Sequence, residues 1–403
     1  MLQKGSEITS ISKKVNSSNI NNFGNDLEFL SLYTSVVYLS DAEKLSGLIV
    51  CPDLQGRIIT SAAEGLKGQS FGWINYELIG SQKILPRANF FGGEDRFWLG
   101  PEGGQFSVFF EQGVPFDLDH VHTPAPVDSE SFDIESRGDD QVHLTKKMIL
   151  TNYSGTTFNL KVDRVIRLLS KETAFDYLNI QPSAGIKMVA FQSENTITNI
   201  GLKDWEKASG LLSIWILGMF KASDATTVII PLKETDDVGN YVNDTYFGKV
   251  PKDRLVLKKN TLFFKGDAQL RSKIGVSLKG VKPILGSYDA TNEVLTLVQF
   301  TLHEEAQDYV NSMWEIQINP YNGDVINSYN DGPSEQGGKQ LGKFYELETS
   351  SHAAALKPDE SILHIHRTFH IYGTKEELDK ISLKTLGVSL EVIKTVYIPT
   401  SPP

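Results

Sequence analysis

The segment KKMILTNYSGTTFNLKVDRVIRLL, residues 146–169, carries the clearest structural pattern in the chain. In its second half, apolar and polar side chains alternate, which is typical of a strand with one buried face. The apolar positions of this half are Phe158, Leu160, Val162, Ile166 and Leu168. Lys161, Asp163 and Arg167 occupy the other face, and Asn152 to Gly155 supply turn residues between the two arms. The segment therefore predicts a β-hairpin in an antiparallel sheet.

Further runs of the same kind extend in both directions from this hairpin. They are 48–63, 105–110, 213–220, 226–232, 254–266, 273–278, 293–302, 312–320, 343–350 and 361–373. Helical patterns are few: they lie near 26–31, near 202–209 and at 375–386. The last of these begins with a capping box formed by Thr374 and Glu377. Many short strands with turns between them predict an all-β antiparallel sandwich or barrel.

The chain reads as one domain preceded by a tail. No low-complexity linker divides residues 25–403, so this stretch is expected to fold as a single large domain. Residues 1–24 are rich in serine and asparagine and are expected to be a flexible tail. No repeat with a period of 20–50 residues is present, which disfavours a propeller or a solenoid.

Composition narrows the class of partner. The net charge is −11 and no Lys/Arg run stands out, so nucleic acid is not expected as a partner. The longest apolar run, 211–220, is too short to span a bilayer. The single cysteine, Cys51, lies in an apolar run and is expected to be buried. Neither a periplasmic location, with an export signal removed, nor a cytoplasmic one is excluded.

Residues 70–104 concentrate the side chains that sugar recognition uses. They are Trp73, Asn75, Arg87, Asn89, Glu94, Arg96, Trp98 and Glu102. Aromatic faces can cover the apolar side of a pyranose, while amides, guanidinium groups and carboxylates can satisfy its hydroxyls. The glycines between Gly92 and Gly104 allow the backbone to approach a ligand closely. The alternative is a turn-rich connection with solvated charges and a core tryptophan.

A second candidate segment is residues 318–333, INPYNGDVINSYNDGP. Asn327, Tyr329 and Asp331 would share one face if the segment is extended, which makes them candidate substrate-binding residues. A plain hairpin with Asx-type turns is the alternative interpretation.

The third candidate segment is residues 344–370. Glu346 and Glu348 would share one side of a strand, and His364 and His366 would share one side of the next. Carboxylates beside imidazoles suit general acid–base catalysis, so these four are candidate catalytic residues and Arg367 is a candidate substrate-binding residue. The ligand spacing gives little support to a metal site, and no metal or cofactor is expected. A solvated strand face remains the alternative.

Three motifs resemble the galactose mutarotase (aldose 1-epimerase) superfamily. Residues 348–350, Glu-Thr-Ser, stand where that superfamily has a catalytic Glu in an E-T-Q-like strand, and LKPDES at 356–361 resembles the turn that follows. VCPDLQGRI at 50–58 resembles its early strand with a GxR-type turn. GGEDRFWLGPEGG at 92–104 resembles the GG(D/E)xxWxxP signature of uncharacterised bacterial mutarotase-like proteins. Residues 25–373 are similar to one such family of unknown function.

The resemblance implies a β-supersandwich fold with few short helices and a concave face that holds a sugar. It also implies that Glu348 is the general base, whereas the superfamily's acid is a histidine in a His-x-Tyr-Phe-type motif. Here NPYNGD places Asn319 at that position, so His364 or His366 is the hypothetical acid. The expected function is epimerase-type chemistry on a mono- or oligosaccharide. Non-catalytic carbohydrate binding, a polysaccharide lyase and a glycosidase-associated domain are the alternatives.

Overall fold

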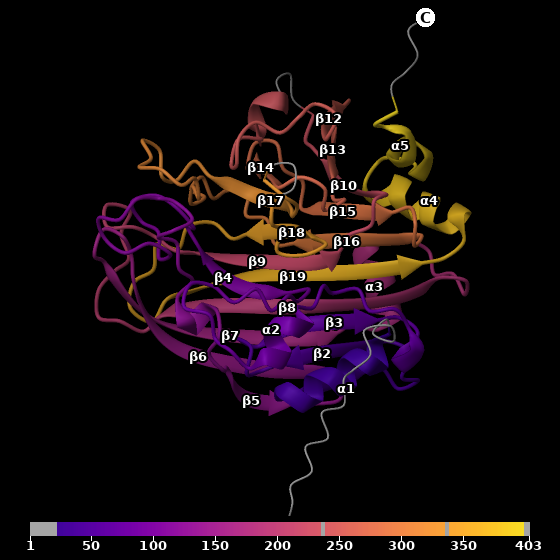
Figure 1. The fold of residues 1–403 in the computed structure, drawn as a ribbon, viewed down its shortest axis with the longest axis horizontal. Coiled ribbons are helices and arrows are strands. Elements are labelled where there is room, and N and C mark those ends of the chain that lie inside the picture. Colours follow the sequence, from indigo (N-terminus) through magenta and orange to yellow (C-terminus); the bar gives the residue numbers. More distant parts are fainter. Residues whose placement is uncertain (1–21, 235–237, 335–337, 399–403) are drawn as a thin grey trace, which may run out of the picture.

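The computed structural model describes residues 22–234, 238–334 and 338–398, which form two large antiparallel sheets, a small sheet and a few short helices (Figure 1). The predicted tail 1–24 lies almost wholly outside the described residues. Helix α1 already begins at Phe23, which is fully buried, and its N-cap Asn22 accepts a hydrogen bond from the Asn25 backbone N–H. Helix α1 therefore begins within the segment that the sequence predicts to be a tail.

The ten-stranded sheet has the order β12-β13-β10-β15-β16-β19-β8-β7-β6-β5. In chain order its strands are β5 (Asp133–Arg137), β6 (Gln141–Thr151), β7 (Thr157–Leu168), β8 (Lys187–Asn199), β10 (Thr226–Pro231), β12 (Leu255–Lys258), β13 (Thr261–Lys265), β15 (Ile284–Asp289), β16 (Val294–Phe300) and β19 (Ser361–Tyr372). The predicted hairpin is confirmed as β6 and β7, which pair from Gln141 opposite Arg167 to Thr151 opposite Thr157.

The six-stranded sheet has the order β11-β14-β17-β18-β9-β4. In chain order its strands are β4 (Arg96–Gly100), β9 (Ser213–Lys221), β11 (Val242–Asn243), β14 (Ser272–Ser277), β17 (Asp324–Asn330) and β18 (Phe344–Ser350). One of its faces packs against the ten-stranded sheet, since Tyr345 of β18 hydrogen-bonds Ser287 of β15 and Phe220 clusters with Val228 and Phe264. Both faces of β18 and β9 are buried, and β9 accordingly reads as an almost continuous apolar run.

The small sheet comprises β1 (Val37–Ser40), β2 (Gly47–Cys51) and β3 (Arg57–Ala62). Leu48, Val50 and Ile58 join the core cluster of β6 to β8, whereas Ile49 and Cys51 pack beneath α1 (Phe23–Tyr33) and α2 (Tyr76–Ser81). The thiol of Cys51 is fully buried, as expected from its apolar neighbours, and burial raises its pKa. This layer lies at the lower edge of Figure 1.

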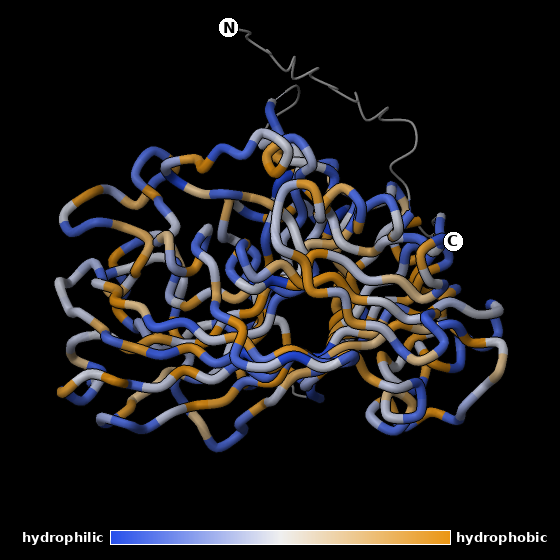
Figure 2. Tube along the Cα trace, turned by 90° about the horizontal axis from the view of Figure 1, so that it is seen from below, coloured by the Kyte–Doolittle hydropathy of each residue, from blue (hydrophilic) through white to orange (hydrophobic). Residues whose placement is uncertain are grey.

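Three helices cover part of the ten-stranded sheet. Helices α3 (Lys171–Leu178), α4 (Lys375–Thr385) and α5 (Leu390–Thr395) pack Phe175, Leu378 and Ile393 into one cluster with apolar side chains of that sheet. Short 3₁₀ turns occur at Gly65–Lys67, Ala125–Val127 and Val238–Tyr241. The capping box of α4 is confirmed, with both Thr374–Glu377 contacts present. Figure 2 shows apolar stretches gathered inside the layers and polar ones along the outer loops.

Three predicted elements are wrong. Residues 105–110 and 312–320 are irregular rather than strands, and 202–209 forms turns rather than a helix. Val108, Phe109 and Phe110 are nevertheless buried, so the apolar pattern reports burial of a loop and not strand pairing. Helices α2, α3 and α5 were not predicted. Their length of six to eight residues leaves too few turns for a clear helical periodicity.

The two glycines that open the segment 92–104 meet a tight steric requirement. Gly92 has φ +95°, and a Cβ added to it would lie 2.0 Å from the carbonyl oxygen of Trp73. We expect Gly92→Ala to lower the free energy of unfolding by more than the roughly 1–3 kcal/mol that a strained backbone conformation alone costs. Gly113→Ala is the matched control, because Gly113 has φ +85° but open space around it. Chemical denaturation of both variants measures the difference, and equal losses would contradict the steric argument.

Candidate functional site

Alternate side chains of neighbouring strands share the face of the six-stranded sheet that points away from the ten-stranded sheet. Glu346 of β18 lies directly opposite Tyr329 of β17, which in turn lies opposite Lys273 of β14. On the other side, Arg96 lies opposite Leu217. Since directly paired residues of an antiparallel sheet point to the same side, this register gathers chemically different groups on one surface.

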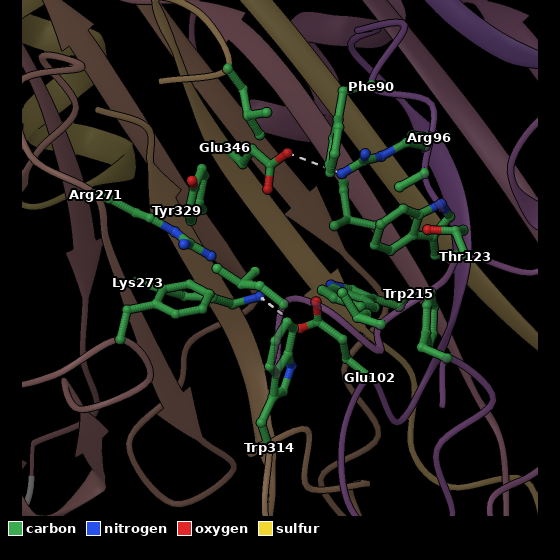
Figure 3. Close-up of a pocket in the computed structure, with 18 of the residues that line it drawn as sticks. Phe90, Arg96, Glu102, Thr123, Trp215, Arg271, Lys273, Trp314, Tyr329 and Glu346 are labelled. Atoms are coloured by element: carbon green, nitrogen blue, oxygen red, sulfur yellow. Dashed lines mark hydrogen bonds and ion pairs between the residues drawn. The ribbon is translucent and has the colours of Figure 1, made fainter. Parts of the chain in front are cut away.

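This surface is the floor of a pocket, and loops supply its walls (Figure 3). The pocket has a cavity volume of about 120 Å³ and opens to solvent. Its aromatic lining residues are Phe90, Trp98, Phe109, Trp215, Phe247, Trp314, Tyr329 and Phe344. Its charged lining residues are Arg96, Glu102, Arg271, Lys273 and Glu346. Such a mixture of flat apolar walls and a few polar groups fits a ligand with an apolar face and polar edges.

Two buried contacts between basic and acidic side chains organise the pocket. Arg96 Nη2 lies 3.0 Å from Glu346 Oε1, and the Arg96 guanidinium lies 4.1 Å from the centroid of the Trp98 ring. Lys273 Nζ lies 3.1 Å from Glu348 Oε2 and 3.9 Å from Glu102 Oε2. A buried charge without a partner is very costly, so in each contact the two side chains hold one another in place.

Burial also changes the proton affinity of these groups. It raises the pKa of Glu346 to about 8, and the neighbouring Glu348 and Glu102 add to this effect, although Arg96 opposes it. The pKa of Glu102 is raised by burial, with Lys273 acting against the shift. Burial alone would lower the pKa of Lys273. The nearby carboxylates of Glu348, Glu102 and Glu346 have the larger effect, so the pKa of Lys273 is raised. A carboxyl group that holds its proton near neutral pH can act as a general acid.

Glu348 lies next to the pocket without lining it. Its side chain is fully buried, and its Oε2 accepts a hydrogen bond of 3.0 Å from Trp215 Nε1 in addition to the contact with Lys273. Its Oε1 has no hydrogen-bond partner among the residues that the structure describes. Glu348 therefore lies behind Lys273 and Trp215 and supports both.

His364 and His366 lie on the other side of the six-stranded sheet, so the structure does not pair them with Glu346 or Glu348. Both histidines are on β19 and contact the hydroxyl of Thr349, at 2.8 Å and 2.9 Å respectively. Thr349 points away from the pocket because it follows Glu348 in the strand. Burial lowers the pKa of His366 to about 4 and that of His364 well below its usual range, so both imidazoles are neutral at pH 7. This geometry corrects the predicted acid role of these histidines.

The other predicted site residues fall into three groups: some line the pocket, some support its lining residues, and the rest lie outside it. Arg96, Trp98 and Tyr329 line the pocket together with Glu346. Asp331 supports it, because its carboxylate accepts hydrogen bonds from the Tyr329 hydroxyl (2.8 Å) and from the backbone of residues 341 and 342. Asn327 lies in the floor strand, where its side-chain amide donates to the carbonyl of Ile274.

The remaining predicted site residues do not line the pocket. Two of them belong to the local framework. Asn75 caps α2, and Asn89 donates to Asp128 at 2.7 Å. Trp73 packs on Phe344, which does line the pocket, with ring centroids 4.7 Å apart. Sequence proximity in the segment 70–104 therefore does not translate into one common site.

The charged members of this group lie elsewhere. Glu94 is buried between the sheets and bonds Ser61 and His370. Arg87 is exposed and pairs with Asp119 at 3.4 Å. Arg367 lies on β19 of the ten-stranded sheet, with its guanidinium over the ring of Tyr177. Each of these three charged side chains has a contact within the protein, so none of them needs a bound ligand as its partner.

The lining residues that the sequence analysis did not single out include Trp215, Arg271, Lys273 and Trp314. Arg271 and Lys273 alternate at the start of β14, a pattern that also fits a solvated strand edge. Trp215 lies in an apolar run in which the sequence does not distinguish the two faces, and Trp314 lies in a segment that the sequence predicts to be a strand.

Within the described ranges, no three His, Cys, Asp or Glu side chains are grouped so as to hold a metal ion. No helix among these residues has the length and apolarity needed to cross a membrane.

Comparisons with known proteins agree with this architecture. The sequence model of a family of unknown function, DUF6786, matches residues 21–397. A proposed aldose 1-epimerase from Escherichia coli K12 is similar in structure, with a TM-score of 0.50, 12% identity, and coverage of 84% of this chain and 99% of that one. A protein from Synechocystis sp. PCC 6803 is also similar in structure, with a TM-score of 0.51 and 12% identity; the match covers 84% of this chain and 96% of that one. No curated protein matches the chain in sequence. The fold is therefore that of the galactose mutarotase-like proteins, as the motifs predicted.

Proposed function

Since the chain belongs to DUF6786, a family of unknown function, we propose its function from the pocket itself: it binds a sugar and catalyses acid–base chemistry at the anomeric centre. The observation that carries this proposal is the placement of Glu346. This carboxyl group lines an aromatic-walled pocket, and burial raises its pKa to about 8. It can therefore give and take a proton near neutral pH.

The pocket walls suit a pyranose ring. Trp98 and Trp215 pack edge to face, with centroids 5.5 Å apart, and offer flat apolar surface beside the charged groups. Trp314 lines the pocket from a loop. A ring stacked on such a surface would present its hydroxyls to Arg96, Lys273 and the carboxylates.

Interconversion of anomers requires an acid and a base on two sides of the sugar ring and no cofactor. Figure 3 shows Glu346 and Glu102 on opposite sides of the pocket, with the Lys273 ammonium next to Glu102. In the proposed reaction Glu346, which is protonated at neutral pH, donates its proton to the ring oxygen. Glu102, next to Lys273, accepts the proton of the anomeric hydroxyl. The ring opens, the carbonyl group rotates, and the reverse proton transfers close it again.

Proton NMR of freshly dissolved aldoses tests the proposal. The purified chain should accelerate the approach to anomeric equilibrium for at least one sugar in a panel of neutral and acidic aldoses. Heat-denatured protein at the same concentration is the control for buffer catalysis. Rates equal to the control across the whole panel would overturn the catalytic proposal.

Carbohydrate binding without catalysis is the second candidate, and two observations favour it. Among the residues that the structure describes, no histidine lines the pocket. In addition, Arg96 and Lys273 already engage the carboxylates of Glu346 and Glu348. Calorimetry separates the two candidates, since saturable sugar binding with no change in anomer exchange would identify a binding protein.

A further inference from the structure

We infer that the sugar bound in this pocket carries a negatively charged group, a carboxylate or a phosphate ester, and that Arg271 recognises it. This inference rests on the proposed sugar site and narrows its ligand to one chemical class. Three observations carry it: donors without acceptors, an excess of cations, and the position of Arg271.

Several buried hydrogen-bond donors of the pocket residues lack an acceptor. The Nε and Nη1 atoms of Arg96 are buried and have no partner among the described residues, and the same is true of Trp98 Nε1 and Arg271 Nε. Buried polar groups are nearly always satisfied, so these donors require acceptors, which ordered water or a bound molecule can supply. Here the missing atoms are acceptors, and a carboxylate or phosphate supplies several acceptor oxygens and no competing donor.

The charge balance points the same way. Arg96, Arg271 and Lys273 face Glu346, Glu102 and Glu348. Because burial raises the pKa of Glu346 to about 8, this group is mostly uncharged at pH 7, and its partner Arg96 then lacks a counterion. The described part of the pocket thus holds three cations against at most two carboxylates. A ligand with one negative charge would restore the balance.

Arg271 is the cation with no carboxylate of its own. No ion pair joins it to any described residue, and its guanidinium lies 4.1 Å from the centroid of the Phe247 ring. The nearby carboxylate of Asp331 is already occupied by the Tyr329 hydroxyl and two backbone N–H groups. Figure 3 shows the Arg271 side chain extending into the pocket between Tyr329 and Lys273. A guanidinium held by an aromatic ring presents a planar fork that matches an anionic group in two contacts.

Isothermal titration calorimetry on the full chain tests the inference. The probes are glucuronate, galacturonate and glucose 6-phosphate, with glucose and galactose as the neutral counterparts. At pH 7 we expect at least one acidic sugar to bind about tenfold or more tightly than its neutral counterpart, as a charge-assisted contact implies. The acidic arm that binds more tightly, uronate or phosphate ester, identifies the anionic group. At about pH 9 the preference should shrink, because ionised Glu346 then competes for Arg96.

Variants identify the residue. Arg271→Gln should weaken binding of the acidic sugar about tenfold and leave the neutral sugar unchanged, whereas Arg271→Lys should retain part of the preference. Arg137→Gln, the same change on the exposed strand β5, is the matched control and should alter neither. Equal affinity for acidic and neutral sugars, or an equal loss of both in Arg271→Gln, would overturn the inference while leaving the sugar site intact. Absence of binding by every sugar would overturn both.

Discussion

Replacing Glu346 with glutamine should slow catalysed anomer interconversion by at least about 100-fold, the lower end of what a positioned general acid contributes. Glutamine keeps the size and one oxygen of the side chain, so Arg96 Nη2 retains an acceptor and the pocket keeps its shape. The variant loses only the proton that Glu346 exchanges. Saturation-transfer NMR of the two anomers measures the rate directly, and Glu135→Gln on the exposed strand β5 is the control.

The pH dependence of the wild-type rate gives an independent readout of the same group. With a pKa of about 8, Glu346 carries its proton below this pH and loses it above. The rate should therefore fall as the pH rises through about 8, and the Glu346→Gln variant should lose this limb of the profile. A variant with the wild-type rate, or one that keeps the alkaline limb, would remove Glu346 from the mechanism.

Replacing Asp95 with asparagine should cause the largest loss of stability of any change considered, about 3–5 kcal/mol, because it breaks an ion pair with no access to water. Asp95 pairs with Arg164, both side chains are fully buried, and Ser193 Oγ donates to the same carboxylate at 2.6 Å. Asparagine would leave the Arg164 charge uncompensated between the sheets. Chemical denaturation followed by tryptophan fluorescence measures the change.

Lys187→Gln provides the contrast for Asp95→Asn. Lys187 pairs with Glu64 at the surface, where both side chains are largely solvated, so its loss should leave the unfolding midpoint almost unchanged. Equal midpoints for Asp95→Asn and wild type would show that the Asp95–Arg164 pair does not secure the two sheets to each other.

The parts of the fold that follow from the sequence are those with a strong local signal. The alternation in 158–168, the turn at 152–155 and the capping box of α4 each depend on neighbours in the chain, and each is confirmed. The strand 344–350 likewise predicts that Glu346 and Glu348 share a face. What it cannot show is which face lies against the second sheet, because both faces of β18 are buried.

The site depends on contacts between distant segments, and here the sequence gives less. His364 and His366 do share one face of a strand, but β19 belongs to the other sheet, so that face meets Thr349 and not the glutamates. Lys273 was not singled out because its role depends on Glu348, which is 75 residues away in the chain and two strands away in the sheet. Local periodicity predicts neither the sheet to which β19 belongs nor the proximity of β14 to β18.

A crystal structure of the protein with its best-bound sugar tests the central claim most directly. The account predicts that the ring lies in the pocket over the six-stranded sheet, with a sugar oxygen within hydrogen-bond distance of Glu346 and the ring against the tryptophan wall. A sugar bound on another surface, with Glu346 and Arg96 left without contact to it, would contradict the account.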